Sequence, residues 1–124
     1  MILVDTSVWV DHLRRGDAAL VAALEADTVV AHAFVVGELA CGQLKSRHQV
    51  LSLLRSLTQL AAATDDEALY FLERHRLFGH GLGYIDVHLL AAAALNRDAL
   101  LWTRDKPLKT VAAELGLAHV GPAR

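Results

Sequence analysis

Short, uninterrupted runs of apolar residues alternate along this chain with segments whose apolar residues recur at helical spacing. The clearest runs are residues 2–4, 28–31 and 99–103. Runs of this length between helical segments are typical of strands buried on both faces of a parallel sheet. Residues 60–63 and 117–120 are weaker runs, which we predict as two further short strands.

Polar residues at capping positions divide the intervening segments into helices. Ser7 and Asp17 are each predicted to cap a helix, and Gly16 is suited to end the first of them. Helical spacing begins again near residue 33 and, after a polar break, near residue 50. The first half of the chain therefore predicts several helices between its strands.

A capping box marks the next helix. Thr64 can cap it, and Glu67 lies at the spacing that lets its side chain reach back. The paired Asp65 and Asp66 are then interpreted as favourable charges in a first helical turn, not as metal ligands.

The segment 84–95 is apolar nearly all round, which predicts a central, buried helix. A last helix has Pro107 in its first turn and ends at Gly116. Strands that alternate with helices in this way predict an α/β fold with a central parallel sheet. We expect one domain over residues 1–124, a three-layer α/β/α sandwich.

Composition adds an expected location. The 124 residues are 54% hydrophobic, which is ample for one core. No apolar stretch approaches the roughly 20 residues of a membrane-spanning helix, and the first residues lack the pattern of a signal peptide. Cys41 is the only cysteine, which excludes a disulfide framework. We therefore expect a cytoplasmic protein.

The formal net charge of -2 argues at first against a nucleic-acid partner. If four of the 14 acidic residues were neutralised at a metal site, however, the 12 Lys and Arg would outnumber the rest. Composition therefore permits an RNA partner but does not require one.

Four acidic residues interrupt otherwise apolar surroundings. Asp5 and Asp105 follow predicted strands, Asp86 begins the buried helix, and Glu38 lies within an apolar helix. The carboxyl ends of parallel strands form the functional edge of an α/β sheet, and the helices that follow begin there. The four side chains could therefore converge.

Such a cluster would need a cation, because unpaired carboxylates at close range repel each other and are costly to desolvate. Mg²⁺ or Mn²⁺ prefers carboxylate and water oxygens as ligands. Two such ions about 4 Å apart can activate a water and stabilise the leaving oxygen of a phosphodiester. Thr6, Ser7 and Thr103 would orient the carboxylates or bound waters.

Each acidic residue also has a purely structural interpretation. Asp5 or Ser7 could merely cap the first helix, and Asp86 could be a favourable helix N-terminal charge. Asp105 could be a turn residue before Pro107, and Glu38 could extend to solvent.

Four sequence motifs resemble those of PIN-domain ribonucleases. They are Ile2-Leu3-Val4-Asp5-Thr6-Ser7, Val35-Val36-Gly37-Glu38-Leu39, Gly83-Tyr84-Ile85-Asp86-Val87-His88-Leu89-Leu90-Ala91-Ala92 and Leu101-Trp102-Thr103-Arg104-Asp105. Chain length and spacing most resemble the VapC toxins of prokaryotic toxin–antitoxin pairs, and the resemblance covers essentially the whole chain.

The resemblance implies a Mg²⁺- or Mn²⁺-dependent endoribonuclease that cleaves RNA by attack of water. Asp5, Glu38, Asp86 and Asp105 would be its catalytic metal ligands. A homodimer and neutralisation by a cognate antitoxin protein are also implied.

RNA contacts are less readable from the sequence. Arg104 is the best-placed candidate for a phosphate contact, because it adjoins a proposed ligand. Other scattered candidates are Arg14, Arg15, Lys45, Arg47, Lys106 and Lys109. Trp9 and Trp102 are interpreted as core residues, not as surfaces for base stacking.

Two other functions remain open. One is a non-catalytic PIN-fold module that binds RNA or protein. The other is a Mg²⁺-binding receiver domain, which would need an acidic pair after the first strand, where this chain has Asp5-Thr6-Ser7.

Overall fold

Four short strands form one parallel sheet in the computed structural model, which describes residues 1–121. They are β1 (Ile2–Val4), β2 (Val29–Ala31), β3 (Thr58–Gln59) and β4 (Leu100–Trp102). Their order is β3-β2-β1-β4, so β1 lies between β2 and β4. This arrangement brings the residues that follow β1 and β4 together at one edge of the sheet.

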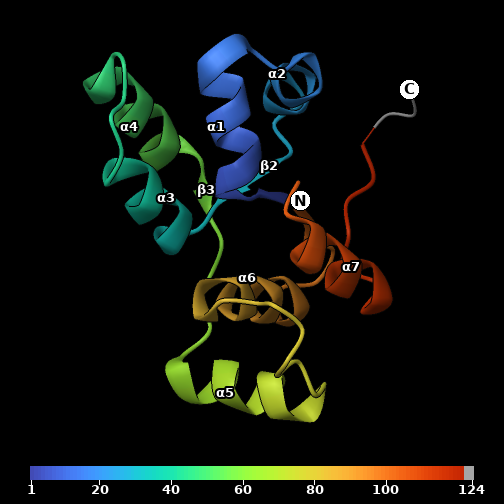
Figure 1. Cartoon of the computed structure of the whole chain (residues 1–124). Coiled ribbons are helices and arrows are strands. Elements are labelled where there is room, and N and C mark those ends of the chain that lie inside the picture. Colours follow the sequence, from blue (N-terminus) through green and yellow to red (C-terminus); the bar gives the residue numbers. More distant parts are fainter. Residues whose placement is uncertain (122–124) are drawn as a thin grey trace.

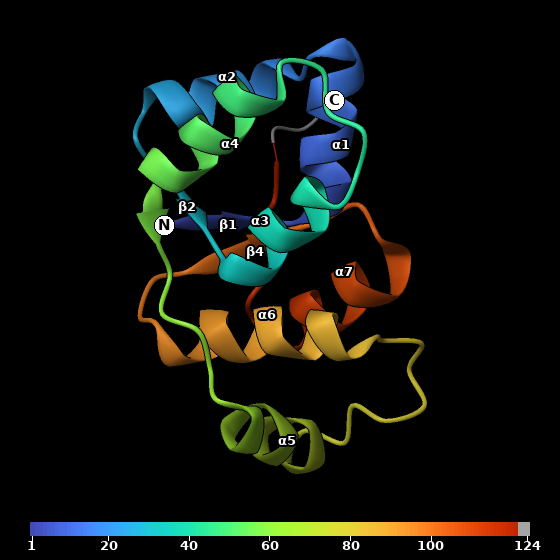
Figure 2. The same ribbon diagram turned by 90° about the vertical axis from the view of Figure 1, so that its left-hand side faces the viewer.

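Helices cover both faces of this sheet (Figures 1 and 2). One face carries α1 (Thr6–Arg15), α2 (Ala18–Glu25), α3 (Ala33–Ala40) and α4 (Arg47–Ser56). The other face carries α6 (Tyr84–Leu95) and α7 (Lys106–Glu114), and α5 (Asp65–Arg74) packs on the outer side of α6. The predicted α/β/α sandwich with a central parallel sheet is confirmed.

The helix predicted to be central and buried is α6. Every residue from position 87 to position 93 is buried, because the helix lies between the sheet and α5. The capping box of α5 is also confirmed, since Thr64 Oγ1 accepts from the Glu67 amide and the Glu67 carboxylate accepts from the Thr64 amide. Trp9 and Trp102 are buried, in agreement with their interpretation as core residues.

Two predicted strands were wrong. The strand expected at residues 60–63 is instead the two-residue β3, because pairing with β2 stops after Leu60 donates its amide to Ala31. Residues 117–120 form only a single parallel bridge, between Leu101 and Ala118. Both are segments at the edges of the sheet, where local sequence does little to fix the extent of pairing.

The predicted cap of the first helix was also wrong. Asp5 occupies the N-cap position of α1, and Ser7 lies inside the helix with its hydroxyl bonded to Asp5. By contrast, Asp17 does cap α2, since its side chain accepts from the Leu20 amide. Within residues 1–121, no helix is both long and apolar enough to cross a bilayer.

Candidate active site

The site begins with Asp5, which is only 6% exposed at the end of β1. The register of β1 against β4 pairs Val4 with Trp102, and the Asp5 amide continues the ladder by donating to the Trp102 carbonyl at 2.9 Å. Asp5 and Thr103 are therefore neighbours although 98 positions separate them in the sequence. Their proximity is a consequence of strand pairing.

Two hydroxyl groups donate to the same oxygen of Asp5. Ser7 Oγ lies 2.8 Å from Asp5 Oδ2, and Thr103 Oγ1 lies 2.7 Å from it. Among the described residues Asp5 Oδ1 receives no hydrogen bond, so that oxygen is available to a ligand. These bonds fix the orientation of a carboxylate that is nearly removed from solvent.

The same two hydroxyls also hold the chain that leaves β4. Ser7 Oγ accepts from the Arg104 amide at 3.0 Å, and Thr103 Oγ1 accepts from the Asp105 amide at 3.1 Å. The turn that carries Asp105 is thereby tied to the first turn of α1.

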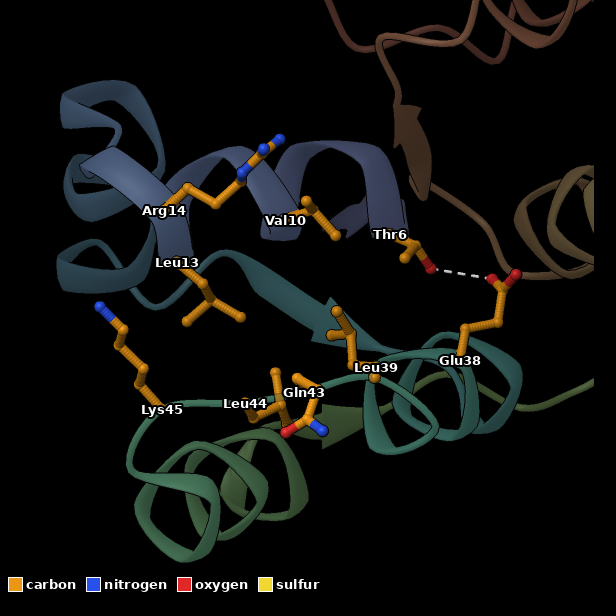
Figure 3. A pocket seen from close by; sticks show the side chains of 10 residues that line it. Thr6, Val10, Leu13, Arg14, Glu38, Leu39, Gln43, Leu44 and Lys45 are labelled. Carbon is orange, nitrogen blue, oxygen red and sulfur yellow. Dashed lines mark hydrogen bonds between the residues drawn. The ribbon is translucent and has the colours of Figure 1, made fainter.

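Glu38 reaches the site from α3. Its Oε1 accepts a 2.8 Å hydrogen bond from Thr6 Oγ1 at the start of α1 (Figure 3). Glu38 is exposed, as its structural interpretation expected, yet its carboxylate is held by Thr6 and does not extend freely into water.

Asp86 lies in the first turn of α6 and is half-buried. Burial raises its pKa, and the negative charges of Asp5, Asp105 and Glu38 raise it further. A hydrogen bond from the Gly83 amide to Asp86 Oδ2, at 2.9 Å, opposes this rise in pKa. The structure thus brings Asp5, Glu38 and Asp105 within electrostatic reach of Asp86.

Asp105 was interpreted from the sequence as a possible turn residue, and in the structure it has a more specific structural role. It caps α7, since its Oδ2 accepts from the Leu108 amide at 3.1 Å. This hydrogen bond uses one oxygen of a side chain that is otherwise exposed.

The donor set is suited to a hard divalent cation, because carboxylate oxygens and water are the ligands that Mg²⁺ and Mn²⁺ prefer. Within residues 1–121, no three His, Cys, Asp or Glu side chains stand close enough to share one ion as they are. Like charges without a counterion are expected to spread apart. Closing the set around an ion requires side-chain movement, which the free oxygen of Asp5 and the exposure of Glu38 and Asp105 permit.

Arg104 has partners that sequence analysis missed. Its Nη1 donates to Asp11 Oδ2 at 2.7 Å, and its Nη2 donates to Asp17 Oδ2. Hydrogen bonding to Arg104 lowers the pKa of both Asp11 and Asp17. A contact between Arg104 and an RNA phosphate stays a prediction, and it would have to compete with two carboxylates.

A cavity of about 570 Å³ adjoins the site between α1 and the segment around α3 (Figure 3). Thr6 and Glu38 lie at one end of it, and Arg14 and Lys45 lie at the other. Its walls are largely apolar and include Val10, Leu13, Leu39 and Leu44. The cavity therefore runs from a carboxylate of the site to two cations.

Comparison with known proteins identifies a family and two relatives. The family model of the PIN domain matches residues 2–114. Two curated relatives, from two strains of Mycobacterium tuberculosis, are both named ribonuclease VapC32. Each is 52% identical over 118 residues, which cover 95% of this chain and 95% of the relative.

Proposed function

The chain belongs to the PIN-domain family, and from this premise we propose that it is a metal-dependent endoribonuclease and the toxin of a toxin–antitoxin pair. The observation that carries this proposal is the placement of Asp5, Glu38 and Asp105 around the half-buried Asp86, close enough for their charges to raise its pKa. Identity of 52% with ribonucleases over nearly the whole chain supports the activity. Membership in this family removes the receiver-domain alternative.

Asp5, Glu38, Asp86 and Asp105 would hold Mg²⁺ or Mn²⁺, which matches their all-oxygen donor set. When bound, such an ion lowers the pKa of a water and stabilises charge that develops on a phosphodiester. Asp86 would benefit from such an ion, because its burial and its acidic neighbours penalise its charged form.

The chain's own hydrogen bonds prepare these ligands. Ser7 and Thr103 donate to one oxygen of Asp5, which leaves the other oxygen for the ion. Thr6 orients Glu38, and the Gly83 amide orients Asp86. Donors of this kind stabilise carboxylates in their charged, ligating form and reduce the rearrangement that binding requires.

RNA is the proposed substrate, a cognate antitoxin protein the proposed inhibitor, and the cytoplasm the proposed location. We propose a homodimer as well. Its support is the exposure of large apolar side chains such as Leu69, Tyr70 and Phe78, at 50%, 70% and 58%. Light scattering during size-exclusion chromatography would contradict the dimer if only the mass of one chain appeared at micromolar concentration.

The test of the activity is cleavage of total RNA by antitoxin-free protein, with Mg²⁺ or Mn²⁺ and with EDTA. Asp5→Asn should abolish cleavage, because it removes a proposed ligand while keeping the shape of the side chain. Asp66→Asn is the matched control, since Asp66 is an exposed acid in the first turn of α5. It should cleave as the wild type does.

Three outcomes would count against the proposal in different ways. Cleavage that survives EDTA would remove the metal from the mechanism. Equal cleavage by Asp5→Asn would remove the proposed site. Tight RNA binding without cleavage in any metal would favour the non-catalytic PIN-fold module.

A further inference from the structure

Two histidine side chains are fully enclosed near the site and play no part in the proposed chemistry. His32 is 0% exposed at the N-cap of α3, and His88 is 1% exposed within α6. Each has one ring nitrogen that is buried and has no hydrogen-bond partner within residues 1–121, namely His32 Nε2 and His88 Nδ1. Buried polar atoms of this kind are rare, because leaving them unpaired costs free energy.

The protonation of the His32 ring follows from its other nitrogen. His32 Nδ1 accepts a 2.9 Å hydrogen bond from the Phe34 amide, so this nitrogen carries no proton. Burial lowers the pKa of His32, which favours the neutral ring. The proton of that neutral ring is then on Nε2, and the unpaired atom of His32 is a donor.

The His88 ring has the complementary form. Its Nε2 lies 3.1 Å from Asp65 Oδ1, and an ionised carboxylate can only accept. His88 Nε2 therefore carries a proton, and a ring whose single proton is on Nε2 can accept only at Nδ1. The two unpaired buried atoms can thus pair as donor and acceptor.

The two rings belong to one cluster. Both pack edge-on against Phe34, with ring centroids 5.3 Å away for His32 and 4.8 Å away for His88. Electrostatic interaction with His88 also lowers the pKa of His32. The described structure shows no hydrogen bond between His32 Nε2 and His88 Nδ1, so pairing them requires a ring rotation or a bridging water.

We propose that His32 and His88 are positioning residues, joined by a buried hydrogen bond from His32 Nε2 to His88 Nδ1, either directly or through one water. The bond completes a chain from the Phe34 amide through both rings to Asp65. It links α3, which carries Glu38, to α6, which carries Asp86. The effect on cleavage rests on the proposed function, whereas the bond itself does not.

The bond is tested by two-bond nitrogen–proton NMR of the imidazole rings near neutral pH. Both rings should be Nε2-protonated, with His88 Nδ1 unprotonated. The His32 Nε2 proton should exchange with water much more slowly than the ring proton of His80, an exposed histidine. A proton on His88 Nδ1, or exchange of the His32 proton as fast as that of His80, would overturn the proposal.

Two variants remove the bond. His32→Asn keeps an acceptor for the Phe34 amide, because Asn is a good N-cap, but it lacks the Nε2 donor. His88→Phe keeps an aromatic ring against Phe34 but has no acceptor, and it also loses the contact with Asp65. The double variant should lose little more thermal stability than the worse single variant, and additive losses would overturn the bond.

Positioning is tested in the same variants without reference to cleavage. The backbone amide resonances of Glu38 and Asp86 should shift in both single variants and stay unshifted in the control His80→Asn. Mn²⁺ affinity should fall about tenfold in each single variant, as expected for residues that support metal ligands. Unshifted resonances would overturn the positioning role, and a wild type that cleaves no RNA would overturn only the proposed function.

Discussion

Arg104 and Asp105 are neighbours in the sequence, but each belongs to a different group of charged residues. The acids of the two groups have pKa values shifted in opposite directions. Asp11 and Asp17 share the guanidinium of Arg104, which lowers the pKa of both. One position further along the chain is Asp105, which helps to raise the pKa of Asp86. The first group has its cation built into the chain, and the second is the one for which we propose a cation that comes from outside.

The contrast separates acids that serve stability from acids that serve a ligand. A carboxylate with a lowered pKa stabilises the fold when charged, whereas one with a raised pKa destabilises it when charged. The charged form of Asp86, whose pKa is raised by burial and by its acidic neighbours, therefore lowers the stability of the metal-free protein. Metal binding should recover that loss, since a ligand that binds only the folded state stabilises it.

The largest expected effect comes from Asp86→Asn. It should reduce cleavage by at least about 100-fold, a factor in the range seen when groups that hold a metal are lost. In EDTA the same variant should melt at a higher temperature than wild type, because it removes a buried charge that its acidic neighbours penalise. Thermal unfolding with and without Mn²⁺ checks this. The ion should raise the melting temperature of wild type more than that of the variant. A variant less stable than wild type in EDTA would contradict the comparison.

A smaller effect is expected from Ser7→Ala. It removes one of two donors to Asp5 Oδ2 and leaves the Arg104 amide without its acceptor. Thr103 still holds Asp5, so cleavage should fall by only about tenfold, as for partners that orient metal ligands. The fall should appear in kcat and in metal affinity, with KM for RNA nearly unchanged. Ser52→Ala, at an exposed position of α4, is the control.

Much of this contrast was predictable from local sequence, but the cation in the first group was not. The position of Asp5 after β1 and the burial of α6 follow from runs of apolar residues. The pairing of Arg104 with Asp11 and Asp17 joins residues 93 and 87 positions apart. Charged residues on α1 and before α2 give no local sign of such a partner.

Other errors have the same physical origin. Ser7 has the right residue type for a cap, but β4 brings Thr103 beside it and its hydroxyl bonds to Asp5 instead. The two-residue β3 exists only through pairing with β2. His88 did carry a signal, since it is a polar residue in the middle of an apolar helix, but its partner Asp65 comes from α5.

Replacement of Arg104 tests the acids that have a built-in cation. Arg104→Gln should lower the melting temperature by a few degrees, because Asp11 and Asp17 lose their counter-charge. Both acids have lowered pKa values in the fold, so their stabilising effect is present above their ordinary pKa of about 3.9. It is lost as the pH falls through the lowered values. The difference between variant and wild type should therefore shrink below about pH 4. A difference that persists there would mean that lost packing, not lost charge, causes the destabilisation.

The smallest effect is expected at the far end of the cavity, where Arg14 and Lys45 lie at the opposite end from Glu38 (Figure 3). If RNA enters along this cavity, Arg14→Ala and Lys45→Ala should each raise KM a few-fold and leave kcat unchanged. Each should also reduce the slope of log affinity against log salt by about one, because each removes one phosphate contact. Arg74→Ala, on α5 and away from this cavity, should change neither quantity. A lower kcat at constant KM would show that these cations act on the site itself. Unchanged salt dependence in both variants would mean that the RNA does not contact Arg14 or Lys45. The difference between the two acidic groups does not depend on that contact.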